Sequence, residues 1–263
     1  MSEVTVVYRQ LGVLSDPGRA DNFATTFLTP AFSKRTALKV FLDSAVASAW
    51  TLPAGCPPVQ GVTTNPTLVR QAGLPVTLDS YTGLLHAAAD AGLAELMLQL
   101  PRPDASEALR WLETLQKAAA DVAVTLTIKL PCHADWLACI RAVQSQKQAI
   151  LLTGLSNPVQ LLWAQSLGVQ YVAPYIGRLA TDGRDVWPLM QACVAVQSNG
   201  PALLAASIKS HDVLARLIAC GAAAVTLPPA SWAAWSTDPL TEAAITQFEK
   251  DVEASQALKA PGA

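Results

Sequence analysis

The stretch VAVTLTIKL, residues 122–130, decides the fold. Side chains alternate between the two faces of a β-strand, so each face of this stretch can be considered separately. One face carries Val122, Val124, Leu126, Ile128 and Leu130, and the other carries Ala123, Thr125, Thr127 and Lys129. We expect the large apolar face to pack against helices. The other face should point into the interior, with Lys129 near the carboxyl end of the strand.

Similar runs repeat along the chain between Ala37 and Trp235. Each is short and apolar, and each precedes a turn and an Ala/Leu-rich stretch with helical spacing. The other runs are ALKVFLD (37–43), VQGVTTN (59–65), AELMLQ (94–99), KQAILLT (147–153), VQYVAPY (169–175), ALLAAS (202–207) and AAVTLP (223–228). Such alternation is typical of a parallel sheet covered by helices. Eight units favour an α/β fold closed into a (β/α)8 barrel, a TIM barrel.

Several helix starts can also be identified. Asp104 begins a predicted helix that runs to Ala120, and Glu107 follows three residues later, as in many helix N-termini. Asn157 precedes a proline, which favours a helix start there. A last helix is predicted over 239–258, with Asp238 as its cap and Ile245, Phe248 and Val252 on one face. We therefore expect a barrel over 37–236, and a C-terminal helix and tail over 237–263. Residues 1–36 form an N-terminal extension whose role stays open: it could be an arm, a barrel plug or a mis-chosen start.

The composition limits the partners of the chain. Charged residues make up only 14% and hydrophobic residues 51%, against roughly 25% charge in an ordinary soluble domain. We expect part of the surface to be covered by other subunits, as in a homo-oligomer. The net charge is −2, and no run of Lys or Arg indicates nucleic acid or an anionic membrane as a partner.

Targeting and metal-binding signals are not expected either. No apolar stretch of about 18 residues predicts a membrane span, and the start MSEVTVVYRQ does not resemble a secretory signal. The five cysteines are scattered without a CxxC pair, which is typical of reduced thiols in a cytoplasmic protein. The three histidines are far apart in sequence, so no metal site is expected.

Polar residues stand at the carboxyl ends of at least seven of these strands, where active sites of this fold lie. They are Asp43, Thr64 and Asn65, Gln99, Lys129, Thr153, Tyr175 and Ser207. Strand ends are often polar, which would account for threonine and serine. It accounts poorly for Asp43 and Lys129, because an inward charge costs several kcal/mol unless it is paired or neutralised. Lys129 is therefore either catalytic or part of a structural ion pair with Asp43.

A lysine in this place has a specific chemical use. Desolvation lowers its pKa, so part of it becomes the neutral amine, which can attack a ketone and form an iminium ion. The iminium withdraws electrons from the neighbouring C–C bond, which can then break. Proton transfers are needed as well. Asp43, Gln99 and Thr153 could hold a water for the dehydration, and Tyr175 or Asp43 could take the hydroxyl proton.

Four motifs together resemble the transaldolase family, and most closely its short members, the fructose-6-phosphate aldolases and short transaldolases. They are GVTTNPTL (61–68), TIKLP (127–131), VAPYIGR (172–178) and LAASIKS (204–210). The resemblance covers about Val40 to Val252. It implies a barrel enzyme without metal or organic cofactor, acting on a sugar or sugar phosphate. Short members tend to form rings of five that pair into ten.

The resemblance also implies roles for individual residues. Lys129 would form the Schiff base, and Asp43 and Asn65, with Thr64 beside them, would meet the donor hydroxyls. Gln99 and Thr153 would hold a catalytic water, and Arg178 and Ser207 would bind the phosphate.

Three functions stay open at this stage. Gln99 and Tyr175 favour an aldolase that releases its free ketone donor, because transaldolases proper tend to carry Glu and Phe there. A true transaldolase and a non-catalytic sugar-phosphate-binding barrel are the alternatives. The loops at Cys132–His133 and Gly154–Asn157 depart from the family pattern, which leaves the substrate open more than the chemistry.

Overall fold

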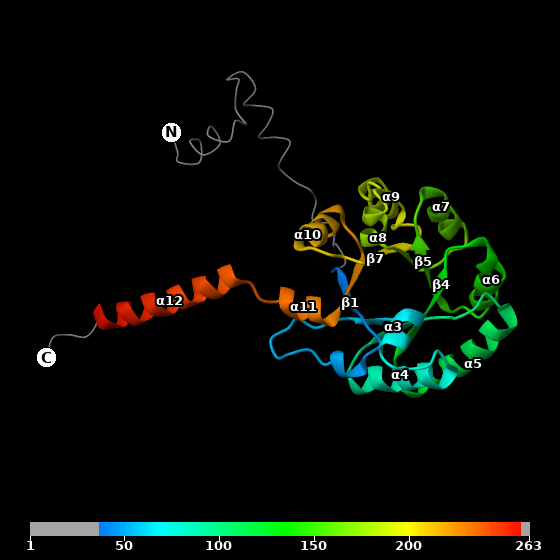
Figure 1. Cartoon of the computed structure of the whole chain (residues 1–263), viewed down its shortest axis with the longest axis horizontal. Coiled ribbons are helices and arrows are strands. Elements are labelled where there is room, and N and C mark those ends of the chain that lie inside the picture. The colour runs from blue at the N-terminus through cyan, green and yellow to red at the C-terminus, as the bar shows by residue number, and fades with distance from the viewer. Residues whose placement is uncertain (1–36, 259–263) are drawn as a thin grey trace, which may run out of the picture. The chain divides into compact units, whose positions relative to one another are not determined.

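A computed structural model describes residues 37–258 of the chain (Figure 1). Eight parallel strands pair in sequence order and close into a barrel. They are β1 (Lys39–Asp43), β2 (Gly61–Thr63), β3 (Glu95–Gln99), β4 (Thr125–Pro131), β5 (Ala149–Leu155), β6 (Tyr171–Pro174), β7 (Ala202–Ala205) and β8 (Ala224–Leu227). The predicted (β/α)8 barrel is confirmed. The predicted extension over residues 1–36 lies outside the described residues.

The helices surround the strands (Figure 1). They are α3 (Pro66–Gln71), α4 (Leu78–Asp90), α5 (Ala105–Asp121), α6 (Leu137–Ser145), α7 (Pro158–Ser166), α8 (Ile176–Thr181), α9 (Trp187–Val196), α10 (His211–Cys220) and α11 (Pro229–Trp235), followed by α12 (Pro239–Leu258). Short 3-10 turns follow β1 at Ala47–Ala49 (η1) and β4 at Ala134–Trp136 (η2).

Three predicted helix starts are confirmed by their capping bonds. Asp104 Oδ1 accepts the backbone N–H of Glu107 at 2.7 Å, and Asn157 Oδ1 accepts that of Gln160 at 3.0 Å. Asp238 Oδ1 accepts the N–H of Leu240 at 2.8 Å. Each carboxylate or amide oxygen satisfies a donor that the first helical turn leaves without a partner.

The side chains of the strands form two apolar layers. Inside the barrel a small cluster consists of Phe41, Met97, Leu151, Ala173, Leu204 and Ala224, all buried. Outside, a larger cluster fills the space between sheet and helices and includes Leu42, Leu96, Leu98, Leu126, Ile128 and Leu130. The predicted outward face of β4, with Leu126, Ile128 and Leu130, is therefore confirmed.

Polar side chains lie at the amino ends of the strands as well. Lys39 Nζ donates to the hydroxyl of Tyr171 at 3.2 Å, and Thr127 Oγ1 donates to Glu95 Oε1 at 2.8 Å. Burial raises the pKa of Glu95, which the bond from Thr127 and the charge of Lys39 partly oppose. The interior apolar cluster separates these groups from the carboxyl ends of the strands.

One strand start differs from the prediction. The strand was expected from Val122, but α5 continues to Asp121 and Val122 is its C-cap. The chain then turns through Ala123, whose φ is 56°, and β4 begins at Thr125. Val122 and Ala123 therefore belong to no strand face, because the α5–β4 turn interrupts the alternation there.

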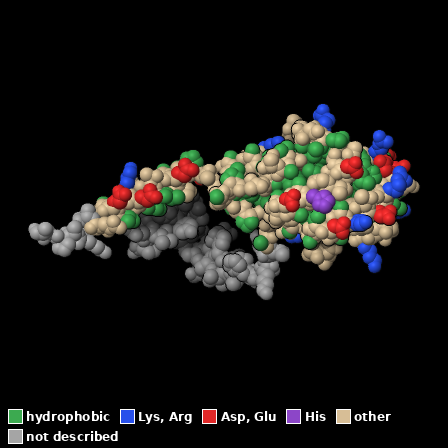
Figure 2. All heavy atoms as spheres, turned by 90° about the horizontal axis from the view of Figure 1, so that it is seen from below, with side chains coloured by type: hydrophobic (Ala, Val, Ile, Leu, Met, Phe, Trp, Pro, Cys, Tyr) green, Lys and Arg blue, Asp and Glu red, His purple; other side chains and the backbone are tan. Residues whose placement is uncertain are grey.

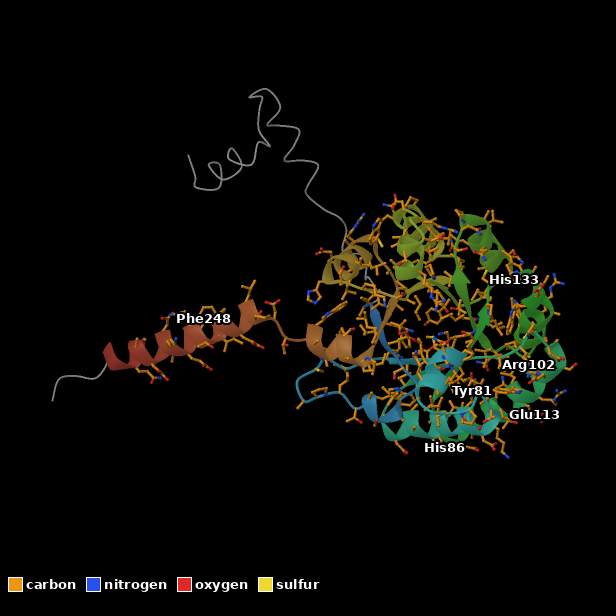
Figure 3. The ribbon with its side chains drawn as sticks, viewed as in Figure 1. Tyr81, His86, Arg102, Glu113, His133 and Phe248 are labelled. Carbon is orange, nitrogen blue, oxygen red and sulfur yellow. The ribbon has the colours of Figure 1, made fainter. Side chains whose placement is uncertain are left out.

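The helix α12 has the predicted bounds, and its predicted apolar face is exposed. Ile245, Phe248 and Val252 are 51%, 64% and 56% exposed, and Figure 3 labels Phe248 on this helix. In the view of Figure 2, acidic and basic side chains are interspersed rather than gathered by sign. Within residues 37–258, no helix combines the length and the apolar character that a membrane crossing needs.

Candidate active site

Lys129 lies inside the barrel near the carboxyl end of β4. Only 5% of the residue is exposed, and its Nζ donates to the backbone carbonyl of Thr64 at 2.6 Å. Burial lowers the pKa of the ammonium group, and the negative charge of Asp43 opposes this. Removal from water disfavours the charged form, so a larger share of the lysine is the neutral amine. The side chain can therefore serve as a nucleophile.

Asp43 approaches Lys129 without pairing directly with it. Among the described residues, the ion pairs within 4.0 Å join His133 to Asp135 and Arg184 to Asp182. The structural Lys129–Asp43 pair, which the sequence left open, is not formed. Lys129 and Asp43 are still close enough for their charges to interact. Because Asp43 forms no ion pair with Lys129, its carboxylate remains available to a substrate.

Two threonines that the sequence analysis did not single out hold Asp43. Thr63 Oγ1 lies 2.9 Å from Asp43 Oδ1, to which it donates, and 2.7 Å from Thr226 Oγ1. Asp43 and Thr63 are paired across β1 and β2, and both threonines are buried. The alternation of β2 and β8 could have identified them, since each stands on the inward side of its strand.

Gln99 is paired with Lys129 across β3 and β4. Its side-chain Oε1 is buried and has no hydrogen-bond partner within the described part of the chain. Its backbone carbonyl accepts the hydroxyl of Tyr81 at 2.8 Å. Tyr81 lies on α4 (Figure 3) and packs edge to face with Trp111 of α5, their ring centres 5.2 Å apart. No sequence pattern indicated Tyr81, because its contact depends on how α4 packs against β3.

Thr153 and Tyr175 form a second pair of polar groups. Thr153 Oγ1 donates to the hydroxyl oxygen of Tyr175 at 2.5 Å. Burial raises the pKa of Tyr175, while the bond from Thr153 and the charge of Arg178 oppose the rise, and the charge of Asp43 adds to it. Tyr175 is therefore a protonated phenol at neutral pH and can donate a proton.

Arg178 lies in α8, and Ser207 lies in the loop after β7. The guanidinium carbon of Arg178 is 4.6 Å from the ring centre of Tyr175, and the side chain is exposed. Gly177 donates its N–H to the carbonyl of Ser207 at 3.0 Å. A methyl group on Gly177 would meet the carbonyl oxygen of Ser207 at 2.6 Å and its Oγ at 2.7 Å. The absence of a side chain at Gly177 thus lets α8 and the loop after β7 approach each other.

Ser207 corrects a sequence expectation. It was placed at the inward end of its strand, but β7 ends at Ala205 and Ser207 has a φ of 62°. The left-handed backbone conformation, and not strand alternation, sets the position of its hydroxyl.

Thr64 and Asn65 both have structural partners. The hydroxyl of Thr64 donates to the carbonyl of Met97 at 3.2 Å. The backbone carbonyl of Thr64 is the atom that accepts from Lys129. Asn65 Oδ1 caps α3 by accepting the N–H of Leu68 at 3.0 Å. The amide nitrogen of Asn65 is then the group that can face a substrate oxygen.

Cys132 and His133 follow Lys129 closely in sequence but have other roles. Cys132 is buried, and burial raises the pKa of its thiol to about 11, so it is not a thiolate nucleophile at neutral pH. His133 caps η2 and lies 3.4 Å from Asp135 at the surface. In the range 37–258, no group of three or more His, Cys, Asp or Glu side chains could hold a metal ion.

Comparisons with known proteins show the family of the chain. The family model described as transaldolase/fructose-6-phosphate aldolase matches residues 106–261, more than half of the chain. The chain belongs to the transaldolase/fructose-6-phosphate aldolase family. It is therefore an enzyme of the aldolase/transaldolase type, which removes the alternative of a non-catalytic barrel.

Relatives within the transaldolase family cover most of the chain. A probable transaldolase of Caulobacter sp. (strain K31) is 30% identical over 221 residues, which are 81% of this chain and 96% of the relative. A probable transaldolase of Bartonella henselae is 29% identical over 222 residues, with the same shares of the two chains.

The solved structures show the fold alone. A flavocytochrome b2 variant has a TM-score of 0.50 at 11% identity, over 76% of this chain. This chain spans only 58% of the length of that protein.

Proposed function

We propose that the protein is a Schiff-base aldolase that cleaves or forms a C–C bond in a ketose phosphate, as fructose-6-phosphate aldolases do. The position of Lys129 carries the proposal. Its amine is buried inside the barrel, has a lowered pKa and lies beside Asp43 without an ion pair. The proposed reaction needs no metal or organic cofactor, because the iminium ion formed on the lysine is itself the electron-withdrawing group.

The first step forms the iminium ion. Neutral Lys129 attacks the carbonyl carbon of the ketose, and the carbinolamine loses its hydroxyl as water after protonation. A water held by Gln99 can shuttle this proton, since Gln99 Oε1 is a buried acceptor without a partner in the described structure. The Thr153–Tyr175 pair supplies hydroxyls for the same water.

The second step breaks the C–C bond. A base removes the proton of the hydroxyl two carbons from the iminium carbon, an aldehyde leaves, and the bonding electrons form an enamine on Lys129. Asp43 is the candidate for that base, because the raised pKa of Tyr175 keeps its phenol protonated. The phenol of Tyr175 then protonates the enamine carbon, and hydrolysis of the iminium releases the ketone and restores the lysine.

The substrate phosphate is assigned to Arg178 and Ser207. Arg178 is exposed near Tyr175, and the contact of Gly177 with Ser207 brings α8 and the loop after β7 together. A guanidinium and a hydroxyl suit the oxygens of a phosphate. Thr64 and Asn65 would line the donor end of the substrate.

A true transaldolase is the second candidate, and the relatives described as probable transaldolases favour it. In that reaction the enamine waits on Lys129 until an acceptor aldehyde arrives. Tyr175 favours the aldolase, because a phenol beside the enamine can protonate it before an acceptor binds. We also propose that the protein is cytoplasmic and forms a homo-oligomer. Its free thiols support the first proposal and the exposed apolar face of α12 supports the second.

The deciding experiment uses fructose 6-phosphate without an added acceptor. An aldolase releases free dihydroxyacetone and glyceraldehyde 3-phosphate in equal amounts over many turnovers. A transaldolase would release at most one equivalent of glyceraldehyde 3-phosphate per subunit and no free dihydroxyacetone, and it would turn over further only after an aldehyde is added. No release and no borohydride-stable adduct under either condition would reject both functions.

A further inference from the structure

The side chain of Gln160, in the first turn of α7, joins two loops at the carboxyl end of the barrel. Its Nε2 donates to the carbonyl oxygen of Cys132 at 2.8 Å. Its Oε1 accepts the backbone N–H of Ser156 at 2.7 Å and the hydroxyl of the same serine at 3.0 Å. Both ends of the amide are therefore bonded, one to the loop after β4 and the other to the loop after β5.

These two loops come directly after proposed catalytic residues. Cys132 stands three residues after Lys129, and Ser156 stands three residues after Thr153. Gln160 therefore connects the strand that carries the amine with the strand that carries the hydroxyl bonded to Tyr175.

The chain between Thr153 and Ser156 is irregular and needs such a connection. The β5–β6 pairing shifts between Thr153 and Leu155, and Gly154 has a φ of 76°. A bulge of this kind turns a side chain to a new direction and interrupts the ladder of backbone bonds. The bond from the N–H of Ser156 to Gln160 fixes the chain on the far side of the bulge.

The position of Gln160 is itself fixed by the start of α7. Its N–H is the one that Asn157 caps, and Pro158 stands at the first helical position. A weaker contact extends the connection, because Arg184 Nη1 donates to the carbonyl of Ser156 at 3.3 Å. Arg184 is exposed and paired with Asp182, so we expect less from it than from Gln160.

We infer that Gln160 is a positioning residue for proton transfer, which sets the Thr153–Tyr175 pair against Lys129. The inference rests on the proposed Schiff-base function. It assigns Gln160 no contact with substrate. Loss of its bonds frees the bulge and shifts Thr153, and with it the phenol that protonates the enamine.

The chain offers a matched control at the opposite end of the same two strands. Gln148 Nε2 donates to the carbonyl of Leu126 on β4 at 2.5 Å, and Gln148 Oε1 accepts from Gln116 at 3.0 Å. Like Gln160, it is half-buried and connects β4 with the β5 segment. Gln148→Met and Gln160→Met therefore remove similar bonds. The first removes them far from the proposed site, and the second removes them close to it.

The experiment measures exchange of the hydroxymethyl hydrogens of hydroxyacetone with D2O by NMR, at saturating ketone. This exchange requires the enamine to form and be protonated. We expect Gln160→Met to slow it by about tenfold or more, since displacement of a catalytic group by ~1 Å can cost 10²-fold. Gln148→Met should stay within about twofold of the wild type. Borohydride should still trap hydroxyacetone on Lys129 in both variants, and their losses in Tm should be similar.

Gln160→Glu adds a readout that a purely structural role would not move. A neutral glutamic acid can donate to the carbonyl of Cys132, whereas a carboxylate cannot and repels it. The exchange rate relative to wild type should therefore fall as the pH rises through the pKa of the new carboxyl group. This variant, close to glutamine in size, also serves if Gln160→Met folds poorly.

Two results would overturn the inference while leaving the proposed function intact. The first is an equal exchange rate in Gln160→Met and Gln148→Met. The second is a ratio of the Gln160→Glu exchange rate to that of wild type that does not change with pH. In both cases the ketone would still be trapped on Lys129 as in wild type. If wild type shows neither trapping nor exchange, the proposed function fails and the inference fails with it.

Discussion

Thr153 Oγ1 donates a hydrogen bond of 2.5 Å to the hydroxyl oxygen of Tyr175, which joins the carboxyl end of β5 to the residue after β6. Because the threonine is the donor, the phenol keeps its own proton for another acceptor. Burial raises the pKa of this phenol, so the proton stays in place at neutral pH. The pair is therefore arranged to deliver a proton.

Tyr175→Phe tests that delivery. The variant has no proton to give, so release of free ketone from fructose 6-phosphate should fall by roughly 10²–10⁴-fold, the usual contribution of one general acid. Transfer of the donor to an added aldehyde should fall less, because transfer consumes the enamine without protonating it. Coupled assays with and without acceptor measure the two rates. An equal loss in both would contradict this role.

Lys129→Met should abolish turnover and the adduct that borohydride fixes in the presence of a ketose. Peptide mapping by mass spectrometry should place the wild-type adduct on Lys129. Lys39→Met is the control, since Lys39 is also a strand lysine of the barrel but bonds to Tyr171 at the amino end. It should keep both adduct and turnover. An adduct mapped to another lysine would reject the assignment.

The lowered pKa of Lys129 also predicts how stability depends on pH. The unfolded chain holds this proton up to the usual lysine pKa of 10.5, whereas the folded chain loses it at lower pH. The unfolded state thus binds more protons between the two values, and stability rises with pH in that window. Relative to Lys129→Met, wild type should gain unfolding free energy as the pH rises towards 10.5. Urea titrations at fixed protein concentration measure the difference, and a flat difference would contradict burial of the charge.

Gly177→Ala should damage the phosphate end of the site. The new methyl group would press on the carbonyl oxygen of Ser207, 2.6 Å away, and separate α8, which carries Arg178, from the loop that carries Ser207. We expect a loss of roughly 1–3 kcal/mol in stability from overpacking. KM for fructose 6-phosphate should rise more than KM for dihydroxyacetone. Gly83→Ala, in open space on α4, should instead stabilise by roughly 0.5–1 kcal/mol. Equal behaviour of the two variants would mean that the close approach does not matter.

The exposed face of α12 should be a subunit contact. Phe248→Asp puts a charge on that face and should lower the molar mass measured by light scattering at micromolar concentration. Ala243→Asp, on the opposite side of the same helix, should leave the mass unchanged. A monomeric wild type would remove the basis for this prediction.

Much of the site follows from alternation along single strands. The sequence analysis placed Asp43, Gln99, Lys129 and Thr153 at the carboxyl ends of four strands, and each lies at that end or within two residues of it in the structure. Alternation succeeds there because these strands are regular up to those residues. It failed for Ser207 and Val122, where a left-handed residue and a helix end replace the strand.

Contacts between distant elements could not be predicted from one sequence. The Thr63–Thr226 bond joins residues 163 positions apart, and the hydroxyl of Tyr81 reaches β3 from α4. The Gln160 connection depends on two loops whose shapes no periodic pattern describes. These contacts form only when the barrel closes, so no local sequence pattern indicates them.

The apolar cluster around Phe41, Met97 and Leu151 has a consequence for how the site exchanges material with solvent. It forms a floor without hydrogen-bonding side-chain groups between the amino-end polar groups and Lys129. If the proposed reaction takes place at Lys129, we expect substrate, product aldehyde and water to enter and leave from the carboxyl end alone. In the proposed reaction, a bound ketose would therefore cover the iminium on Lys129 and shield it from bulk water until a product leaves.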